Sequence, residues 1–195
     1  MHRKGLLDIL SRYASHHASE ADLVGRWESF IASNDQCFER ECLPGHITAS
    51  GWVVSPTVDR VLLVHHRILD MWLQPGGHAE GESDVLAGAL REVEEETGLA
   101  SARAVTVDGH AWLLDIDIHQ IPLQDEMPAH DHYDARFLVV ADPNEAITVS
   151  EESHDVQWFD LSVIEDGEFE QSLRRMARKS TAMSAAVAAT SVPWV

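Results

Sequence analysis

Three glutamates in one short stretch have the spacing that a metal site on a helix requires. Glu92, Glu95 and Glu96 are three and four residues apart, so on a helix they share one face with Cβ atoms about 5–6 Å apart. Like charges at this spacing destabilise a helix mildly unless a positive charge lies among them. Carboxylate oxygens held together in this way are the ligands that Mg²⁺ and Mn²⁺ prefer.

The plain alternative is a solvated acidic face that Arg91 partly neutralises. Two features of the surrounding sequence argue against this alternative. The opposite side of the predicted helix, residues 84–97, is apolar, which docks the helix and gives its acidic side a fixed direction. The preceding stretch PGGHAEG, residues 75–81, is a predicted loop whose glycines let the backbone approach a ligand closely. We therefore favour a site for a hard divalent cation.

The stretch from Gly77 to Leu99 resembles the Nudix box, G-x5-E-x7-R-E-U-x-E-E-x-G-U, in which U is an apolar residue. Its second half, REVEEETGL, matches every fixed position of the motif, and Gly77 lies fourteen residues before Arg91 as the motif demands. One position departs from the motif, because Ser83 replaces the first glutamate and Glu82 stands one residue earlier. The roles of Glu82 and Ser83 are therefore open.

The resemblance implies a role for each residue of the second half. Glu95 and Glu96 would be direct metal ligands, and Glu92 would be a ligand or the base that activates water. Arg91 would orient Glu92 through a charge-assisted hydrogen bond, and the backbone carbonyl of Gly76 would complete the coordination. Arg91, Glu92 and Glu95 are thus the predicted catalytic residues.

The activity that the resemblance implies is hydrolysis of a phosphoanhydride bond in a nucleoside diphosphate linked to another moiety. The implied cofactor is Mg²⁺ or Mn²⁺, since a divalent cation both neutralises a diphosphate and makes water nucleophilic. Two other functions stay open: a ligand-sensing module that keeps the fold without turnover, and a Nudix-fold diphosphate isomerase. The Ser83 departure favours the sensor, whereas the intact second half of the motif opposes it.

Histidines and a neighbouring aspartate form a second group of interest. His78 lies in the glycine loop. His130, His132 and Asp134 share one face of a predicted strand because they alternate along it. The stretches GGHAEGES and HYDARF resemble a subgroup of Nudix proteins in which these positions recur. Contact with the substrate phosphates is one role considered for Gly77, His78, His132 and Asp134. A proton donor for the leaving group and a further metal site are the other roles considered. A surface or hydrogen-bonded core residue is the ordinary alternative for each single histidine.

Two adjacent glutamates precede another predicted strand. Glu151 and Glu152 lie in VSEESHDVQWF, and the resemblance implies that one of them is an accessory metal ligand. A polar turn is the alternative.

Apolar periodicity predicts which elements position these residues. It predicts a helix over residues 3–15, a second helix that begins at a cap on Ser19, strands from Ile47 onward, the helix over 84–97 and a final helix over 168–189. The basic stretch 172–179 could contact phosphates or a nucleic acid. It is expected instead to complement the C-terminal half of its own helix and to pair with surface carboxylates. This mixture indicates an α/β (α+β) fold.

The resemblance implies a Nudix-type α/β/α sandwich around a mixed sheet. The expected division is an N-terminal helical extension over 1–43 and a Nudix domain over 44–195. The N-terminal helices would cover the active site, bind a second subunit or extend the core.

Composition restricts the partners of the chain. The net charge of −19 and the pI of about 4.8 argue against sequence-independent binding to nucleic acid, which needs a basic surface. No apolar stretch approaches the roughly 20 residues of a membrane helix. Cys37 and Cys42 are expected to be free thiols in a reducing cytoplasm. The expected partner is a small molecule, and a homodimer is implied by resemblance only.

Overall fold

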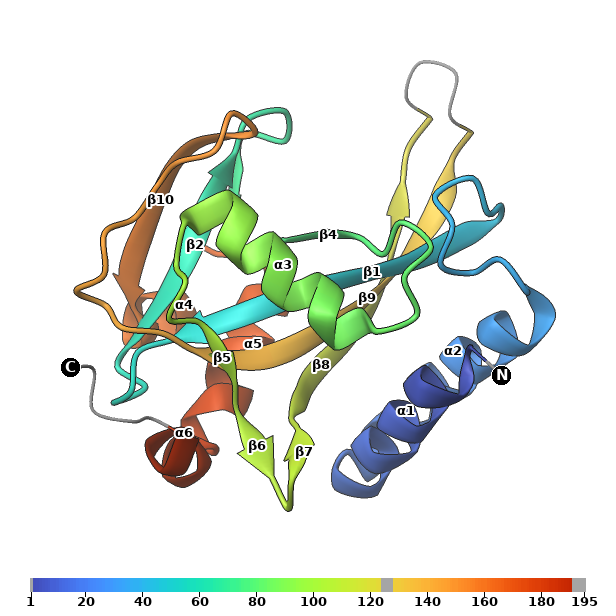
Figure 1. The fold of residues 1–195 in the computed structure, drawn as a ribbon, viewed down its shortest axis with the longest axis horizontal. Helices are drawn as coiled ribbons and strands as arrows, with labels where there is room; N and C mark the ends of the chain where they lie inside the picture. The colour runs from blue at the N-terminus through green and yellow to red at the C-terminus, as the bar shows by residue number, and fades with distance from the viewer. Residues whose placement is uncertain (1, 124–127, 191–195) are drawn as a thin grey trace.

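The computed structural model of the chain describes residues 2–123 and 128–190 (Figure 1). The helices are α1 (Lys4–His16), the 3-10 turn η1 (Ala18–Glu20), α2 (Ala21–Ser33), α3 (Val85–Thr97), α4 (Leu161–Asp166), α5 (Gln171–Thr181) and α6 (Ser184–Thr190). The strands are β1 (Gly45–Val54), β2 (Arg60–His66), β3 (Met71–Leu73), β4 (Gly76–His78), β5 (Arg103–Ala104), β6 (Thr106–Val107), β7 (His110–Ala111), β8 (Leu113–Ile121), β9 (His130–Val140) and β10 (Ser153–Asp160).

A mixed sheet forms the centre of the described structure. Its strands follow the order β10-β2-β1-β9-β5, with β3 beside β2, β4 beside β1 and β8 beside β9. β1 and β9 run parallel from the pair Gly45–Asp131 to the pair Val54–Val140, whereas the other pairings in this sheet are antiparallel. The predicted mixed sheet is thus confirmed.

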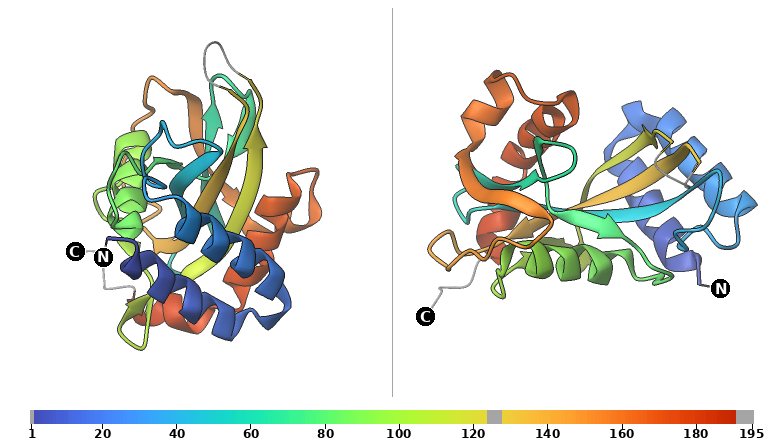
Figure 2. Two further views of the ribbon diagram at one scale, coloured as in Figure 1. Left: turned by 90° about the vertical axis from the view of Figure 1, so that its right-hand side faces the viewer. Right: turned by 90° about the horizontal axis from the view of Figure 1, so that it is seen from above.

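Helices cover both faces of the sheet, as the two views of Figure 2 show. Because alternate residues of a strand face opposite sides, Ile47 and Val53 of β1 join the apolar cluster under α3. Trp52 of β1 joins a second cluster, which contains Leu173 and Met176 of α5. The expected α/β/α sandwich is therefore present.

The N-terminal helices extend the core under α3. Leu10 of α1 and Trp27 of α2 are fully buried, and the Trp27 ring meets the Tyr133 ring of β9 edge-on at 5.5 Å between centroids. The Phe30 ring stacks on the same tyrosine at 3.8 Å. Of the three roles considered for these helices, these contacts support extension of the core. The domain division over 1–43 and 44–195 remains a prediction.

Two predicted helix boundaries were wrong for physical reasons. α2 begins at Ala21 after a 3-10 turn, and its N-cap residue, Glu20, makes no capping bond. The Glu20 carboxylate instead accepts from the hydroxyl of Tyr13 and contacts Lys179 at 2.7 Å. The final helix is divided into α5 and α6. The hydroxyls of Ser180 and Thr181 bond to the carbonyl of Ala177 at 2.9 and 3.1 Å at this point, and such bonds compete with the helical ladder.

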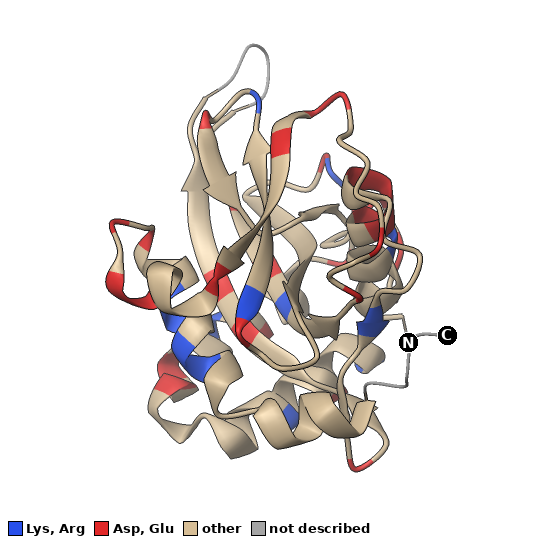
Figure 3. Cartoon of the chain, turned by 90° about the vertical axis from the view of Figure 1, so that its left-hand side faces the viewer, with Lys and Arg blue, Asp and Glu red and all other residues tan. Residues whose placement is uncertain are grey.

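A buried ion network joins β8 and β9 to α5. Arg136 is only 3% exposed, and its guanidinium contacts Asp134 at 2.7 Å, Asp117 at 3.2 Å and Asp115 at 3.3 Å. Asp115, also fully buried, accepts from Arg175 at 2.7 Å and from the Lys179 ammonium at 2.7 Å. Figure 3 shows these basic residues of α5 on the side of the sheet away from the acidic α3. The stretch 172–179 was expected to pair with surface carboxylates. Arg178 does so with Glu165, but the main partner of the stretch is the buried Asp115.

None of the described helices combines the length and the apolar character needed to cross a membrane. Cys37 and Cys42 are both buried and free.

Candidate active site

The helix that carries the glutamates has the predicted limits. The Asp84 carboxylate caps α3 by accepting the N–H of Ala87 at 3.1 Å, and Gly98 ends the helix with φ 73°, a left-handed conformation that glycine adopts without penalty. Val85, Ala89 and Val93 are buried against the sheet. Their burial fixes the direction in which the glutamates of the opposite side point.

The glycine stretch before α3 is a short strand rather than the predicted open loop. β4 pairs with the middle of β1, so that Gly76 lies opposite Ser50 and Gly77 opposite Ala49. A Cβ atom on Gly76 would lie 2.6 Å from the Ser50 Oγ. A Cβ atom on Gly77 would lie 2.6 Å from the Glu92 Cδ. Glycine at these positions lets the sheet, the strand and a carboxylate of α3 meet without a clash.

Glu96 is the most enclosed carboxylate of the helix. It is 6% exposed, and it accepts the backbone N–H of Gly76 at 2.9 Å. Burial raises its pKa to about 7; the Gly76 N–H opposes this shift, and the charges of Glu92 and Glu152 add to it. A carboxylate held protonated by burial and like charges is one that a bound cation would return to its ionised form.

Arg91 is the positive charge among the glutamates. Its guanidinium lies 2.9 Å from a carboxylate oxygen of Glu92 and 2.9 Å from one of Glu95. It also donates to the backbone carbonyl of His78 at 3.3 Å. Burial raises the pKa of Glu92 against the lowering influence of Arg91. The geometry therefore brings together the sequence-predicted residues of the box: Gly76, Gly77, Arg91, Glu92, Glu95 and Glu96.

The remaining acidic residues differ in their relation to this group. The charge of Glu152 raises the Glu96 pKa, whereas no corresponding influence of Glu151 is resolved. The side chains of Glu82 and Ser83 make no hydrogen bond to any described residue. Sequence reasoning missed Glu80, whose charge raises the pKa of Glu92. The available signal was a carboxylate two residues after His78 in the same loop.

Asp134 lies on the same face of the sheet as the histidines but is enclosed. It is 3% exposed, and its oxygens accept from Ser50 at 2.6 Å, Thr48 at 3.2 Å and Gln74 at 3.2 Å. The Arg136 Nε donates to it at 2.7 Å. These contacts occupy Asp134 within the chain, and its role in substrate binding remains a prediction.

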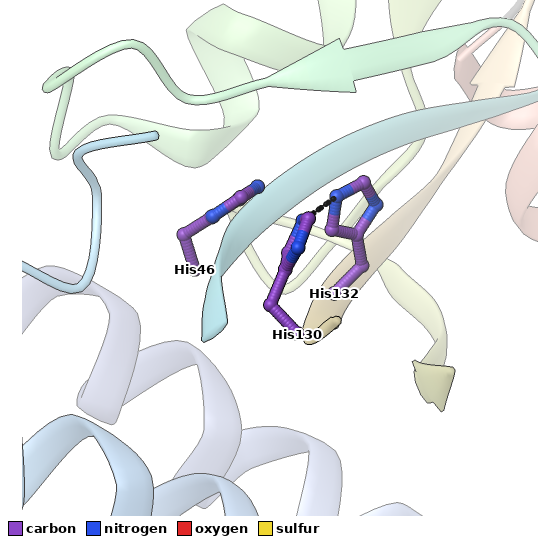
Figure 4. Close-up of side chains that lie close together, drawn as sticks. All are labelled: His46, His130 and His132. Atoms are coloured by element: carbon purple, nitrogen blue, oxygen red, sulfur yellow. Dashed lines mark hydrogen bonds between the residues drawn. The ribbon is translucent and has the colours of Figure 1, made fainter. Parts of the chain in front are cut away.

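His78 and His132 belong to a larger cluster than the sequence indicated. Their ring centroids lie 5.1 Å apart, and the His46 ring lies 5.0 Å from His78 and 4.7 Å from His132. His130 completes the group at 5.2 Å from His132. The parallel register pairs His46 with His132, a long-range contact that no local pattern predicts. Figure 4 shows His46, His130 and His132 near the starts of β1 and β9.

Two hollows elsewhere on the surface are lined without any residue of the box. One, of about 160 Å³, lies between α1 and the β6–β7 hairpin and is lined by residues such as Ile9 and Trp112. The other is an open groove of about 750 Å³ along α2, lined by Gly25 and Tyr133 among others. We therefore place the candidate site at the carboxylates of α3 and the backbone of β4. Carboxylates grouped in this way suit a divalent cation, and no comparable chemistry was predicted from the sequence for the residues of the hollows.

Fold and site together define the class of this chain. The sequence profile of the NUDIX domain matches residues 45–179, and the chain belongs to the Nudix family. Over 90 residues it is 29% identical to the "Probable DHNTP pyrophosphohydrolase" of Lactococcus lactis subsp. cremoris (strain MG1363). That similarity covers 45% of this chain and 51% of the relative, so it spans about half of the relative's length.

Solved structures share the fold at low identity. A NUDIX family hydrolase from Clostridium perfringens has a TM-score of 0.52 at 24% identity, covering 75% of this chain and 98% of its own. The dihydroneopterin triphosphate pyrophosphohydrolase of E. coli has a TM-score of 0.53 at 15% identity, covering 68% of this chain and 92% of its own.

Replacing Gly77 with alanine is expected to impair the site without unfolding the chain. The new Cβ would lie 2.6 Å from the Glu92 Cδ, so the carboxylate must move away from β4. Metal affinity, measured by calorimetric titration with Mn²⁺, should fall, while urea unfolding should change little. Gly88→Ala is the matched control, because its Cβ would meet only the Ala49 Cβ at 3.9 Å. Equal Mn²⁺ affinity in both variants would contradict the placement of Glu92.

Proposed function

We propose that this chain hydrolyses a phosphoanhydride bond in a nucleoside diphosphate linked to another moiety, with Mg²⁺ or Mn²⁺ as cofactor. The observation that carries the proposal is the packing of Glu92 and Glu96 against the backbone of Gly76 and Gly77, with one guanidinium among the carboxylates. This donor set consists of oxygen atoms on rigid elements, which suits a hard divalent cation.

The residues that would hold the cation are Glu92, Glu95, Glu96 and the carbonyl of Gly76. Glu152 is favoured over Glu151 as the accessory ligand, because its charge reaches Glu96. A bound divalent cation would neutralise the diphosphate and lower the pKa of a coordinated water.

The chain's own groups prepare this site. Arg91 holds Glu92 and Glu95 in place and is itself anchored on the His78 carbonyl. Glu92 would act either as a metal ligand or as the base that accepts a proton from the attacking water. Preorganised charges of this kind stabilise a transition state without reorganising during the reaction.

The substrate class is tested with a panel of pyrophosphate compounds. The names of similar proteins suggest dihydroneopterin triphosphate, to which nucleoside diphosphate sugars and an organic diphosphate that can isomerise are added. Release of phosphate, pyrophosphate or nucleotide with Mg²⁺ supports hydrolysis, and Glu95→Gln should remove that release. Tight binding of one compound without turnover would favour the sensor, and rearrangement without water uptake would favour the isomerase. A small-molecule substrate, a homodimer and a cytoplasmic location remain predictions.

Metal binding is expected to stabilise the fold more at pH 8 than at pH 6. The folded pKa of Glu96, about 7, lies above its ordinary 4.5, so protonation stabilises the metal-free fold at low pH, and this contribution is lost as the pH rises through 7. A cation competes with that proton. The rise in melting temperature on adding Mg²⁺, measured by calorimetry, should therefore grow between pH 6 and pH 8. Two results would contradict this assignment. One is an equal rise in melting temperature at pH 6 and pH 8, and the other is the same growth of the rise with pH in Glu96→Gln.

A further inference from the structure

Three histidines converge at the starts of two neighbouring strands, apart from the acidic group on α3. Each of His46, His130 and His132 places a ring nitrogen within 4.8 Å of the other two (Figure 4). The fold explains the meeting. The parallel register sets His46 of β1 opposite His132 of β9, and His130 lies two residues earlier on the same face of its strand.

We propose that His46, His130 and His132 form a second metal site, which binds a divalent transition metal of the zinc class through three imidazole nitrogens. Imidazole suits zinc, copper and nickel, whereas Mg²⁺ prefers oxygen ligands. Three protein ligands leave one tetrahedral position open for water or an oxygen of a substrate. The proposal rests on the histidines alone and stands whether or not the chain hydrolyses a phosphoanhydride.

The distance between two of the rings fits a shared metal. The Nε2 atoms of His130 and His132 are 3.3 Å apart. In a tetrahedral zinc site with Zn–N bonds of about 2.0–2.1 Å, neighbouring nitrogens lie about 3.4 Å apart. The other nitrogen of His130, Nδ1, lies 2.8 Å from the carbonyl oxygen of Pro128. Only a protonated nitrogen can donate to a carbonyl, so Nε2 keeps the lone pair, as in metal-bound histidines whose second nitrogen donates to the backbone.

A simple hydrogen bond between His130 and His132 does not account for His46. This ring is 1% exposed, and neither of its nitrogens makes a hydrogen bond within the described part of the chain. The Cys42 carbonyl lies near enough to affect its titration, but not in hydrogen-bonding geometry. A buried polar group without a partner destabilises the folded state. A metal bound to the His46 ring would remove that cost.

His78 links the histidine cluster to β4, the strand that the acidic group contacts. Its ring lies 5.0 Å from His46, and it directly follows Gly77 on β4, the strand against which Glu92 packs. A metal at the histidines would therefore lie beside β4, the strand that carries Gly76 and Gly77.

The test uses the full-length chain, stripped of metal and titrated with Co²⁺ in excess Mg²⁺. We expect a single equivalent of Co²⁺ to bind with the intense visible absorption of a tetrahedral site rich in nitrogen ligands, and Zn²⁺ to displace it. Glu96→Gln should retain this band, which separates the site from the acidic group. His110→Gln, which alters an exposed histidine outside the cluster, is the matched control.

His130→Gln and His132→Gln should weaken Co²⁺ binding by more than the roughly 10- to 100-fold loss typical of an outer-shell change. His46→Gln should do the same; if it fails to fold, the other two variants decide. The proposal would be overturned if Co²⁺ gave nothing more than a weak, octahedral-type absorption that Mg²⁺ removes. Unchanged Co²⁺ affinity in His132→Gln would overturn it as well.

Discussion

Replacing Glu96 with glutamine is expected to reduce hydrolysis of the active substrate at least roughly 100-fold while leaving the fold intact. A bound cation contributes several kcal/mol to stabilising transition-state charge, and each tenfold in rate corresponds to about 1.4 kcal/mol. The amide oxygen of the introduced glutamine would still accept the Gly76 N–H that Glu96 now accepts at 2.9 Å. It would supply no charge to a metal. Steady-state hydrolysis and urea unfolding of the same preparations measure the two effects.

The matched control for this change is Glu94→Gln. Glu94 lies on the same helix, is exposed, and its side chain makes no hydrogen bond with the described residues. Its substitution should leave the rate within about twofold, since surface changes of this kind rarely exceed about 0.5 kcal/mol. If Glu96→Gln kept the wild-type rate, the site would have to lie elsewhere. If both variants lost activity equally, the net negative charge of α3, and not a specific role of Glu96 as a metal ligand, would explain the loss.

Replacing Arg136 with methionine is expected to lower the free energy of unfolding by about 3–5 kcal/mol, the usual cost of leaving buried charges without their partner. Arg136 is 3% exposed and contacts three aspartates. Burial acts to lower its pKa, but the aspartates outweigh this and raise it. Burial acts to raise the pKa of Asp117, yet His119, Arg136 and Arg175 together hold it below its ordinary value. Urea unfolding at neutral pH measures the loss.

Arg178→Met provides the comparison for Arg136→Met. Arg178 is half-exposed and lies 3.6 Å from a Glu165 oxygen, a surface pair worth at most about 1 kcal/mol. Combining Arg136→Met with Asp134→Asn should cost less than the sum of the single changes, because the two residues share one network. A loss below about 1 kcal/mol in Arg136→Met would show that the network contributes little to stability.

The sequence predicted the acidic helix well because its signals are local. Apolar side chains at helical spacing and a glycine that ends the helix define α3 within a few residues, and the register of the glutamates follows from them. The same reasoning failed at β4. Gly76 and Gly77 carry no strand pattern, and this segment becomes a strand only because the edge of β1 supplies its hydrogen-bond partners. The start of α2 was also misplaced, and the ion pair of its N-cap residue, Glu20, with the distant Lys179 could not be read from local sequence.

The histidine cluster was the least predictable part of the site. The alternation of His130 and His132 was visible, but their approach to His46 depends on the parallel pairing of β1 with β9. That pairing joins segments separated by most of the domain, and periodicity in one strand carries no information about its register. The enclosure of Asp134 by Thr48, Ser50 and Gln74 was hidden for the same reason.

The parallel pairing of β1 with β9 also has a consequence for how the protein folds. Thr48 and Asp134, which meet across these strands, are 86 residues apart in the chain. Contacts of such long range require closure of a large loop before they stabilise anything, and they slow folding relative to local helices. α3 can form early from its own signals, and β4 can pair with β1 across a short loop, whereas His46 can meet His130 and His132 only after β9 reaches β1. A chain released before residue 140 would thus carry the Nudix box without the complete sheet.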